Sequence, residues 1–489
     1  MNKTKDIFSS DSVYETVIGL EVHCQLNTSS KLFCACSTQF GREPNHNTCP
    51  VCLGLPGTLP VLNRNAVDAA IKLALAFGAE IRPTSVFARK QYFYPDLPKG
   101  YQITQYDLPY CFGGGLKLSD GSFVTLTRIH LEEDAGKNIH ADRFSYIDLN
   151  RAGMPLLEIV SEPCIHNASQ AADYLRRLRA LVRHLDISDG NLEEGSFRCD
   201  VNVSIRKRGS KKLGTRCEIK NLNSFRNVEK AIHYEVLRQI DVLEDGLELR
   251  QQTLLYDPAL GRTAPMRSKE EAQDYRYFPD PDLPPLKIDP DRILKIRSTM
   301  PLLPEAIARN YMQSYDLSAE DAEFIALDKD LSTFYEQLIH KCDAAVSPKI
   351  AANWLISEYL REVNTHGWDL KNPPINASAF AELLNMIADN TISGKIAKSV
   401  FEEMVKSGSP ARKIVEEKGL VQVTDEIAIS VAVEEVLNRN PQQVAEYIGG
   451  KEKIYSFFVG QLMQASKGKF NPGLLNKILK EKLDARRLS

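Results

Sequence analysis

The stretch VIGLEVHCQL, residues 17–26, sets the pattern for the first half of the chain. Apolar and polar side chains alternate in it, so that one face would carry Leu20, Val22, Cys24 and Leu26 and the other Glu21, His23 and Gln25. A period of two is typical of a β-strand with one buried face. The stretch therefore predicts a strand that packs on a core and presents a carboxylate and an imidazole on its polar face.

A second stretch, RCDVNVSIR at residues 198–206, repeats the pattern, with Cys199, Val201, Val203 and Ile205 inward and Arg198, Asp200, Asn202, Ser204 and Arg206 outward. Between the two strands, residues 171–185 have apolar side chains at helical spacing and predict an amphipathic helix. Its arginines predict a solvated face, and RNA contact is the alternative. Strands mixed with helices predict an α+β fold with a mixed sheet.

The pattern changes after the proline-rich passage PDPDLPPLKIDP, residues 279–290, which predicts an extended linker or domain edge. Helical periodicity dominates beyond it, at residues 305–315, 349–362 and 378–388. We expect a mixed domain at 1–290, an all-helical domain at 291–405 and a small helical tail at 406–489. From Lys451 onward, nine Lys or Arg residues stand against three acidic ones.

Composition limits the class of protein. A chain of 489 residues is too long for one core, and 43% hydrophobic with 26% charged residues is typical of a globular protein. A net charge of −3 excludes a uniformly basic nucleic-acid binder, so RNA contact would come from local patches. The first fifteen residues have no signal or transit pattern, and no later run of about 18 apolar residues occurs, so we expect a cytoplasmic protein without a membrane span.

Four of the ten cysteines form two close pairs. Cys34 and Cys36 are followed by twelve residues and then by Cys49 and Cys52. Two close thiolate pairs suit a tetrahedral structural zinc site, with four buried free thiols as the alternative. The crowding of nine cysteines between Cys24 and Cys217 is typical of reduced thiols in a cytosolic protein.

Acidic side chains cluster where the predicted strands end. Oxygen ligands and one imidazole suit Mg²⁺ that bridges nucleotide phosphates in phosphoryl transfer. Periodicity does not bring these segments together, so a solvated acidic face stays open as an alternative. The candidates are Glu21, His23, Glu132, Glu133, Asp134, Asp200 and Glu218.

No phosphate-binding glycine motif of the P-loop or dinucleotide type is present in the sequence. If ATP is used, basic side chains such as Lys90 or Lys220 would contact its phosphates together with Mg²⁺. No nucleophile elbow and no HExxH zinc motif occurs either.

At this point the residues resemble a known family, the B subunits of aspartyl/glutamyl-tRNA amidotransferases. The resemblance rests on blocks that follow the order of that family, and the last segment resembles its YqeY-like terminal domain. The blocks are IGLEVHCQL, CPVCLGLPGTLPVLN, RKQYFYPDLPKGYQIT, HLEEDAGK, LNRAGMPLLEIVSEP, DGNLEEGSFRCDVNVSIR, EIKNLNSFRNVEKAI, DYRYFPDPDLPPL and, in the tail, FFVGQLMQASKGKFNPGLLNKIL.

The resemblance implies a cradle-shaped catalytic domain, a helical domain and a tRNA-binding tail. It also implies that ATP phosphorylates the side-chain carboxylate of Asp-tRNA(Asn) or Glu-tRNA(Gln), after which ammonia displaces the phosphate. The ammonia would come from a glutaminase, the A subunit, and a small C subunit would bridge the heterotrimer.

The same resemblance assigns roles to individual residues. His23, Glu133 and Glu218 match Mg²⁺-site positions, with Glu21 and Asp200 as acidic neighbours. Cys34, Cys36, Cys49 and Cys52 match zinc ligands, and Lys90 and Lys220 are expected to contact phosphate. One departure is QQTL at residues 251–254, where the family usually has QETR, so no role is carried over to Gln252 or Leu254.

Four alternatives to a B subunit differ from it in features of the sequence. The related archaeal-type E subunit would need an extra insertion, for which the chain has no room, and a mitochondrial relative would need a transit peptide. A non-catalytic tRNA-binding scaffold would need the cysteine cluster and basic tail but no acidic cleft. A stand-alone ligase would use free ammonia without partners.

Overall fold

The computed structural model describes residues 12–266, 275–423, 425–466 and 469–488. It divides into two compact units, Met1–Pro304 and Glu305–Ser489. The start of the chain up to residue 11, where no targeting pattern is expected, lies outside the described residues. So do Asp274 of the DYRYFPDPDLPPL block and residues 467–468 of the tail block.

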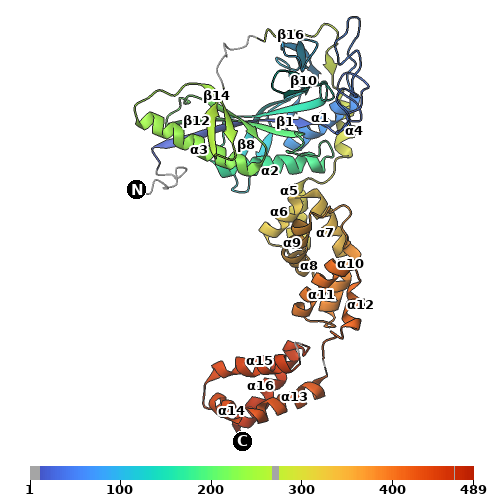
Figure 1. The fold of residues 1–489 in the computed structure, drawn as a ribbon, viewed down its shortest axis with the longest axis vertical. Helices are drawn as coiled ribbons and strands as arrows, with labels where there is room; N and C mark the ends of the chain where they lie inside the picture. Colours follow the sequence, from blue (N-terminus) through green and yellow to red (C-terminus); the bar gives the residue numbers. More distant parts are fainter. Residues whose placement is uncertain (1–11, 267–274, 424, 467–468, 489) are drawn as a thin grey trace. The chain divides into compact units, whose positions relative to one another are not determined.

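A ten-stranded sheet forms the centre of the first unit (Figure 1). Its order is β15-β14-β13-β12-β1-β11-β8-β6-β2, with β7 paired to β8. Its strands are β1 (Tyr14–Gln25), β2 (Glu80–Ile81), β6 (Cys111–Phe112), β7 (Gly115–Lys117), β8 (Phe123–Glu133), β11 (Pro155–Ser161), β12 (Phe197–Lys207), β13 (Cys217–Leu222), β14 (Gln252–Asp257) and β15 (Arg262–Pro265). The pair β13–β14 is parallel and the other pairs are antiparallel, so the sheet is mixed, as predicted.

Both strands expected from alternation are present, and they are neighbours. β1 contains the predicted residues 17–25, and β12 contains 198–206. Val22, Cys24 and Val201 are fully buried, whereas Glu21 and His23 remain partly accessible. Apolar side chains thus hold one face of the sheet on the core and leave a polar face opposite.

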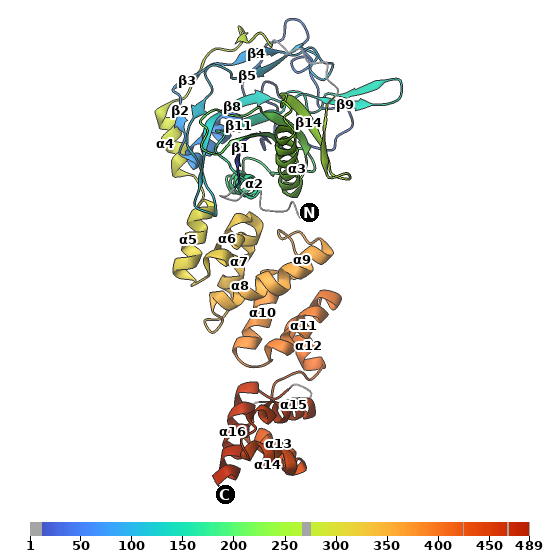
Figure 2. The ribbon, with the colours of Figure 1, turned by 90° about the vertical axis from the view of Figure 1, so that its left-hand side faces the viewer.

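Helices cover the apolar face of the sheet. They are α1 (Arg64–Phe77), α2 (Ala168–His184) and α3 (Phe225–Glu244), whereas α4 (Pro290–Ser298) packs on α1. Helices α2 and α3 lie side by side in both views (Figures 1 and 2). The predicted helix at 171–185 is α2, which begins at the cap residue Asn167, and its apolar stripe is buried. Its Arg176 pairs with Glu229 and its Arg177 with Asp173, so these arginines lie in a charged helix surface.

Smaller strands complete the first unit. They are β3 (Thr84–Ser85), β4 (Ala88–Gln91), β5 (Tyr101–Thr104), β9 (Lys137–His140), β10 (Ser145–Asp148), β16 (Phe278–Pro279) and β17 (Leu286–Lys287). The proline-rich passage contains two short strands separated by a turn, and it does not act as a free linker. β16 pairs with β4, β17 pairs with β3, and Leu283 and Ile288 are buried in the core of the first unit.

The second unit is helical, as predicted, and its described residues form two separate hydrophobic cores. The first runs from Ala308 to Val415 and is built from α5 (Pro304–Ser314), α6 (Ala319–Leu327), α7 (Lys329–Lys341), α8 (Pro348–Trp354), a π-helical turn (Leu355–Tyr359), α9 (Leu360–His366), α10 (Ala377–Ala388), α11 (Gly394–Ser407) and α12 (Ala411–Glu417). The second, from Ile429 to Leu483, is built from α13 (Glu426–Arg439), α14 (Pro441–Ile448), a 3₁₀ turn (Glu452–Ile454), α15 (Tyr455–Ala465) and α16 (Pro472–Leu488).

These cores place the domain limits elsewhere than the expected residues 290/291 and 405/406. Ile296 of α4 is buried with the first unit, because α4 packs on α1. Position 405 lies inside α11, and Ile414 of the following helix belongs to the same core as Met404. The α+β class with a helical second half is confirmed. None of the described helices has the length and apolar character needed to cross a bilayer.

Candidate functional site

The central strands bring most of the predicted site residues onto one face of the sheet. Glu21 lies opposite Asp200, and His23 lies opposite both Glu158 and Arg198. Residues that face each other on neighbouring strands point to the same side of a sheet. The register therefore creates one row of polar side chains across five strands, which we call the polar row. It consists of Glu21, His23, His130, Glu132, Glu158, Arg198, Asp200, Glu218 and Lys220.

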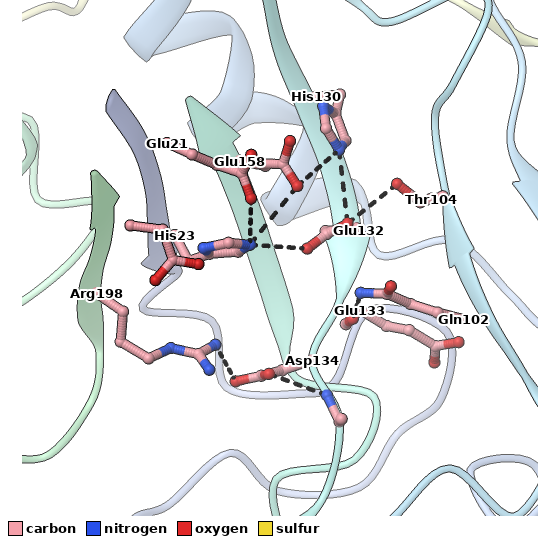
Figure 3. Close-up of polar contacts among 12 residues, drawn as sticks. Glu21, His23, Gln102, Thr104, His130, Glu132, Glu133, Asp134, Glu158 and Arg198 are labelled. Atoms are coloured by element: carbon pink, nitrogen blue, oxygen red, sulfur yellow. Dashed lines mark hydrogen bonds and ion pairs between the residues drawn. The ribbon is translucent and has the colours of Figure 1, made fainter. Parts of the chain in front are cut away.

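Two histidines share the same carboxylates at the middle of the polar row (Figure 3). Nε2 of His23 lies 3.5 Å from Glu158, 3.6 Å from Glu132 and 3.9 Å from Glu21. Nε2 of His130 lies 3.5 Å from Glu132 and 3.6 Å from Glu158. Donor atoms within 4.8 Å of one another occur in the two groups Glu21–His23–Glu158 and His130–Glu132–Glu158, which fits a small divalent cation.

Burial and neighbouring charges shift the pKa values of this centre. Burial, followed by repulsion from Glu158, raises the pKa of Glu21 to about 7. Burial alone would lower the pKa of His23, but its hydrogen bond to Glu158 and the charge of Glu132 raise it to about 9. The pKa of Glu158 is held well below its usual value by His130 and His23 in spite of burial. The centre thus favours a bound positive charge, whether a proton or a metal ion.

Arginines fix one edge of the centre. Arg198 donates to Asp134 across 2.9 Å, and Nε of Arg151 lies 3.4 Å from the same carboxylate. Asp134 is buried, so two guanidinium groups compensate its charge. The predicted acidic residue Asp134 therefore orients Arg198 beside His23 (Figure 3).

A second polar group lies toward the edge of the sheet. Nζ of Lys220 lies 2.9 Å from Asp200 and 3.2 Å from Glu218. Burial would lower the pKa of Lys220, but the two carboxylates raise it above its usual value, so the amine is a stable cation. Thr253 also donates to Glu218, across 2.9 Å. The structure thus brings Asp200, Glu218 and Lys220 together, separately from the histidine centre.

Glu133 lies on the other side of its strand from Glu132. Its carboxylate is buried, pairs with Lys99 and accepts a hydrogen bond from the backbone of Ile103 across 2.9 Å. Adjacent residues of a strand point to opposite faces, so Glu132, not Glu133, reaches His23 (Figure 3). In this geometry the carboxylates of Glu133 and Glu218 engage Lys99 and Lys220, and neither contacts His23.

The four predicted zinc ligands do lie together. Sγ atoms of Cys34, Cys36, Cys49 and Cys52 are all within 4.8 Å of one another, which fits a tetrahedral zinc site. A hydrogen bond from Cys34 is the main cause that lowers the pKa of Cys52 to about 4. Lys31 is completely buried, with Nζ 3.8 Å from Sγ of Cys52 and 3.2 Å from the carbonyl oxygen of Leu149.

The other predicted phosphate ligand, Lys90, is half-buried on β4 with its Nζ 4.8 Å above the ring of Tyr275. At the QQTL departure, Leu254 is buried and Gln252 is half-buried. Apolar packing thus occupies the position where the resembled family usually has a guanidinium.

Sequence reasoning missed Glu158 and His130 as site residues. Glu158 lies in the apolar run PLLEIVS of β11, and a lone charge in such a run is a signal of a buried functional group. His130 precedes Glu132 by two residues on β8, so the period of two that identified His23 applies to it as well. Which strands lie beside β1 could not be seen from periodicity.

Comparisons with known proteins identify the family of this chain. Residues 16–294 match the GatB/GatE catalytic domain, and residues 333–483 match the GatB domain that includes the YqeY-like region. The chain is 54% identical over 476 residues to the B subunit of the aspartyl/glutamyl-tRNA(Asn/Gln) amidotransferase of Thioalkalivibrio sulfidiphilus, and the alignment covers 96% of this chain and 99% of that protein.

Two further relatives carry the same name. The protein of Geotalea daltonii is 54% identical over 478 residues, and that of Nitratidesulfovibrio vulgaris is 52% identical over 475 residues. Each alignment covers 96% of this chain and 99% of the relative. Matches of this extent, together with the domain matches, show that the chain belongs to the family of aspartyl/glutamyl-tRNA(Asn/Gln) amidotransferase B subunits.

Proposed function

We propose that this chain activates and amidates misacylated tRNA, an ATP-dependent carbon–nitrogen ligase activity with glutamine as the amide donor. The observation that carries the proposal is the convergence of two histidines and three carboxylates from β1, β8 and β11 in one centre. A structural framework has no need of so many ionisable groups in contact, and perturbed pKa values are typical of functional sites.

The residues suited to hold Mg²⁺ are Glu21, His23 and Glu158, with Glu132 and His130 adjacent. Glu133 and Glu218 stay predicted ligands, although their carboxylates engage Lys99 and Lys220 in this structure. When bound, the ion would offset the negative charge of the nucleotide phosphates. Arg198 on β12 and Lys220 on β13 lie on the same side of this group in the strand order and would orient the anionic substrates.

The chemistry follows from the carboxylate substrate. An oxygen of the side-chain carboxylate of Asp-tRNA(Asn) or Glu-tRNA(Gln) attacks the γ-phosphorus of ATP, forming an acyl phosphate and releasing ADP. Ammonia then attacks the carbonyl carbon, the C–O bond to phosphate breaks, and inorganic phosphate leaves as the amide forms. The first step is needed because a carboxylate oxygen is a poor leaving group, whereas phosphate is a good one.

The proposed partners are those that would supply ammonia and misacylated tRNA to the chain. The family name places it in a multi-subunit amidotransferase. We propose that a glutaminase, the A subunit, supplies ammonia from glutamine, that a C subunit completes the heterotrimer, and that the basic tail contacts the misacylated tRNA in the cytoplasm. The cysteine cluster would hold a structural zinc ion, because a site closed by four thiolates leaves no position for a substrate.

Amidation by a co-expressed assembly of the chain with candidate A and C subunits tests the proposal. Misacylated tRNA(Asn) and tRNA(Gln) are supplied in parallel with ATP and glutamine. We expect amidation to need ATP, and we expect His23→Ala and Glu133→Ala each to abolish it while tRNA binding persists. His340→Ala, an exposed histidine on α7, is the matched control.

The main alternative is a non-catalytic tRNA-binding scaffold, and normal activity in both mutants would favour it. A stand-alone ligase is the other alternative. Strong glutamine-dependent activity of the isolated chain would contradict the requirement for partner subunits.

A further inference from the structure

Two tyrosines from distant parts of the first unit lie face to face. The rings of Tyr106 and Tyr277 are stacked, with centroids 3.9 Å apart and planes 8° from parallel. Tyr275 meets Tyr277 edge-on, with centroids 6.1 Å apart. We call these three residues the tyrosine platform. Tyr106 is 49% exposed, so the stack presents an accessible aromatic surface.

The tyrosine platform is tied to the polar row by the strands that flank it. Thr104, at the end of β5 and two residues before Tyr106, lies 3.1 Å from Glu132 through its hydroxyl (Figure 3). Tyr277 directly precedes β16, which pairs with β4. Burial, followed by the charges of Glu132 and Glu158, raises the pKa of the Tyr277 phenol well above its usual value. The phenol therefore stays neutral beside the acidic centre.

The backbone between Tyr275 and Tyr277 is strained. Arg276 has a φ of +42°, a left-handed conformation that is unfavourable for a residue with a side chain. Gln91 of β4 donates to the carbonyl oxygen of Tyr275 across 2.9 Å and so helps to hold this segment in place. Strain of this kind is typical of ligand sites, where it fixes side chains in a position they would not otherwise adopt.

The chemistry of the tyrosine platform selects a planar, uncharged ring. An exposed aromatic face beside a stacked partner binds a heterocyclic base by stacking, without reading its edges. Nζ of Lys90 lies 4.8 Å from the centroid of the Tyr275 ring and places a cation beside the platform. This cation could contact a phosphate attached to such a base. An acidic peptide or free carboxylate gains nothing from these rings.

We propose that the stacked pair Tyr106–Tyr277 binds an adenine base next to the polar row. This inference rests on the proposed function, which brings two adenines to the centre: that of ATP and that of the 3′-terminal adenosine of tRNA. Stacking on Tyr106 would hold the base while the phosphates or the aminoacyl group extend toward His23 and Glu158. The platform is a positioning site, because its rings would hold the base and would not touch the reacting atoms.

The test compares ring-removing and ring-keeping variants in the assembly with partner subunits. Tyr106→Leu removes the aromatic face, whereas Tyr106→Phe and Tyr106→Trp keep it. Tyr146→Leu is the matched control, because Tyr146 is 62% exposed on the β10 hairpin. We expect Tyr106→Leu to raise one KM, for ATP or for misacylated tRNA, about tenfold with kcat changed less than about twofold. Tyr106→Phe should restore that KM, since the ring and not the hydroxyl makes the contact.

Equilibrium binding distinguishes the two sources of adenine and does not depend on catalysis. ATP is bound to the assembly without tRNA, and deacylated tRNA is bound with and without its terminal adenosine. If ATP is the occupant, only the Kd of ATP rises in Tyr106→Leu. If tRNA is the occupant, the variant binds full-length tRNA as weakly as wild type binds the shortened tRNA.

Unchanged affinity for both ligands in Tyr106→Leu would overturn the inference, and so would a Tyr106→Phe variant as defective as Tyr106→Leu. Thermal melting of each variant shows whether the fold is retained, and quenching of the Tyr106→Trp fluorescence by the same ligands is a second readout of stacking. A wild-type assembly without ATP-dependent amidation would contradict the proposed function instead, and the binding measurements would still decide on the tyrosine platform.

Discussion

Single residues in the polar row take their properties from neighbours on other strands. Glu158 contacts His23 and His130, and each histidine also contacts Glu132. Because the charges are shared, a substitution at Glu158 is expected to change the protonation of its neighbours as well as its own. The sequence around Glu158 is apolar and contains no hint of these partners.

Glu158→Gln tests this coupling. The variant keeps the size of the side chain and an oxygen that can accept a hydrogen bond, but it removes the negative charge that helps to raise the pKa of His23 to about 9. We expect that pKa to fall toward the usual histidine value, measured by NMR titration of the ring protons in the metal-free protein. Amidation should fall about 100-fold or more, as for the loss of other groups that act on charge in the transition state.

The control is Glu162→Gln, because Glu162 is exposed and lies just beyond the same strand. This variant should change neither the pKa of His23 nor the rate of amidation. A His23 pKa that stays near 9 in Glu158→Gln would show that Glu132 alone determines it.

At the scale of elements, we expect the loop that holds the cysteine cluster to depend on a metal for its order. The cysteine cluster lies in the connection between β1 and α1, which has no regular secondary structure to hold it. A metal that closes such a loop contributes to folding directly. Lys31 is buried beside Cys52, so this loop also encloses a cation that would partly balance a zinc–thiolate site.

Cys36→Ser is expected to lower the zinc content of the purified chain from about one ion to near zero, because three thiolates hold zinc much less firmly than four. The melting temperature should fall by several degrees, measured by calorimetry beside metal analysis. Cys164→Ser, a half-buried cysteine outside the cluster, should leave both unchanged. A wild-type chain without zinc would refute the prediction of a structural metal.

The helices α13 and α16 are joined by charge. Nζ of Lys482 lies 2.9 Å from Glu434, and Arg486 contacts the same carboxylate. The hydrogen bond from Lys482, with that from Arg486, lowers the pKa of Glu434 in spite of slight burial. A carboxylate with a lowered folded-state pKa stabilises the fold above its unfolded pKa, and this contribution is lost as the pH falls through the folded value.

Glu434→Gln should therefore weaken the protection of α13 and α16 near neutral pH and make it less sensitive to acid, measured by hydrogen–deuterium exchange of the full chain. Glu435→Gln, its exposed neighbour, is the control. If wild type and Glu434→Gln lose protection equally as the pH falls, the ion pairs of Glu434 are not the cause of the acid sensitivity of α13 and α16.

At the scale of the whole molecule, the polar row and the basic tail belong to separate cores. The polar row lies entirely within Met1–Pro304, whereas the basic tail has its own core of residues between Ile429 and Leu483. A tail with an independent core can be removed without opening the core before it, provided that the cut follows α12. A cut at the expected boundary, residue 405, would instead pass through α11.

A chain that ends after Gln422 should bind tRNA more weakly and with a smaller dependence on salt. Each lost Lys–phosphate contact means that fewer counterions are released, and it reduces the slope of log binding constant against log salt concentration by about 0.9. Binding at several salt concentrations measures both quantities. Replacement of the tail lysines by glutamine in the full-length chain is the matched control, and it should reproduce the smaller slope. An unchanged affinity would show that the tail only packs.

Much of this protein could be predicted from local sequence, because alternation and helical periodicity reflect burial directly. Residues 17–26 and 198–206 determined two strands and their polar faces, and the spacing of Cys34, Cys36, Cys49 and Cys52 determined a candidate metal cluster. These features depend on residues near one another in the chain, where side-chain direction follows from backbone geometry alone.

Only the tertiary structure decided which polar side chains meet. Strand order placed β11 and β12 on either side of β1, and this brought Glu158 to His23. Glu133, which alternation turns away from His23, met Lys99 from a loop distant in the sequence. The pairing of β16 with β4 likewise brought Tyr277 onto Tyr106 from the far end of the first unit. Strand pairing is a long-range choice made by packing of the whole core, and neither periodicity nor motif spacing contains that information.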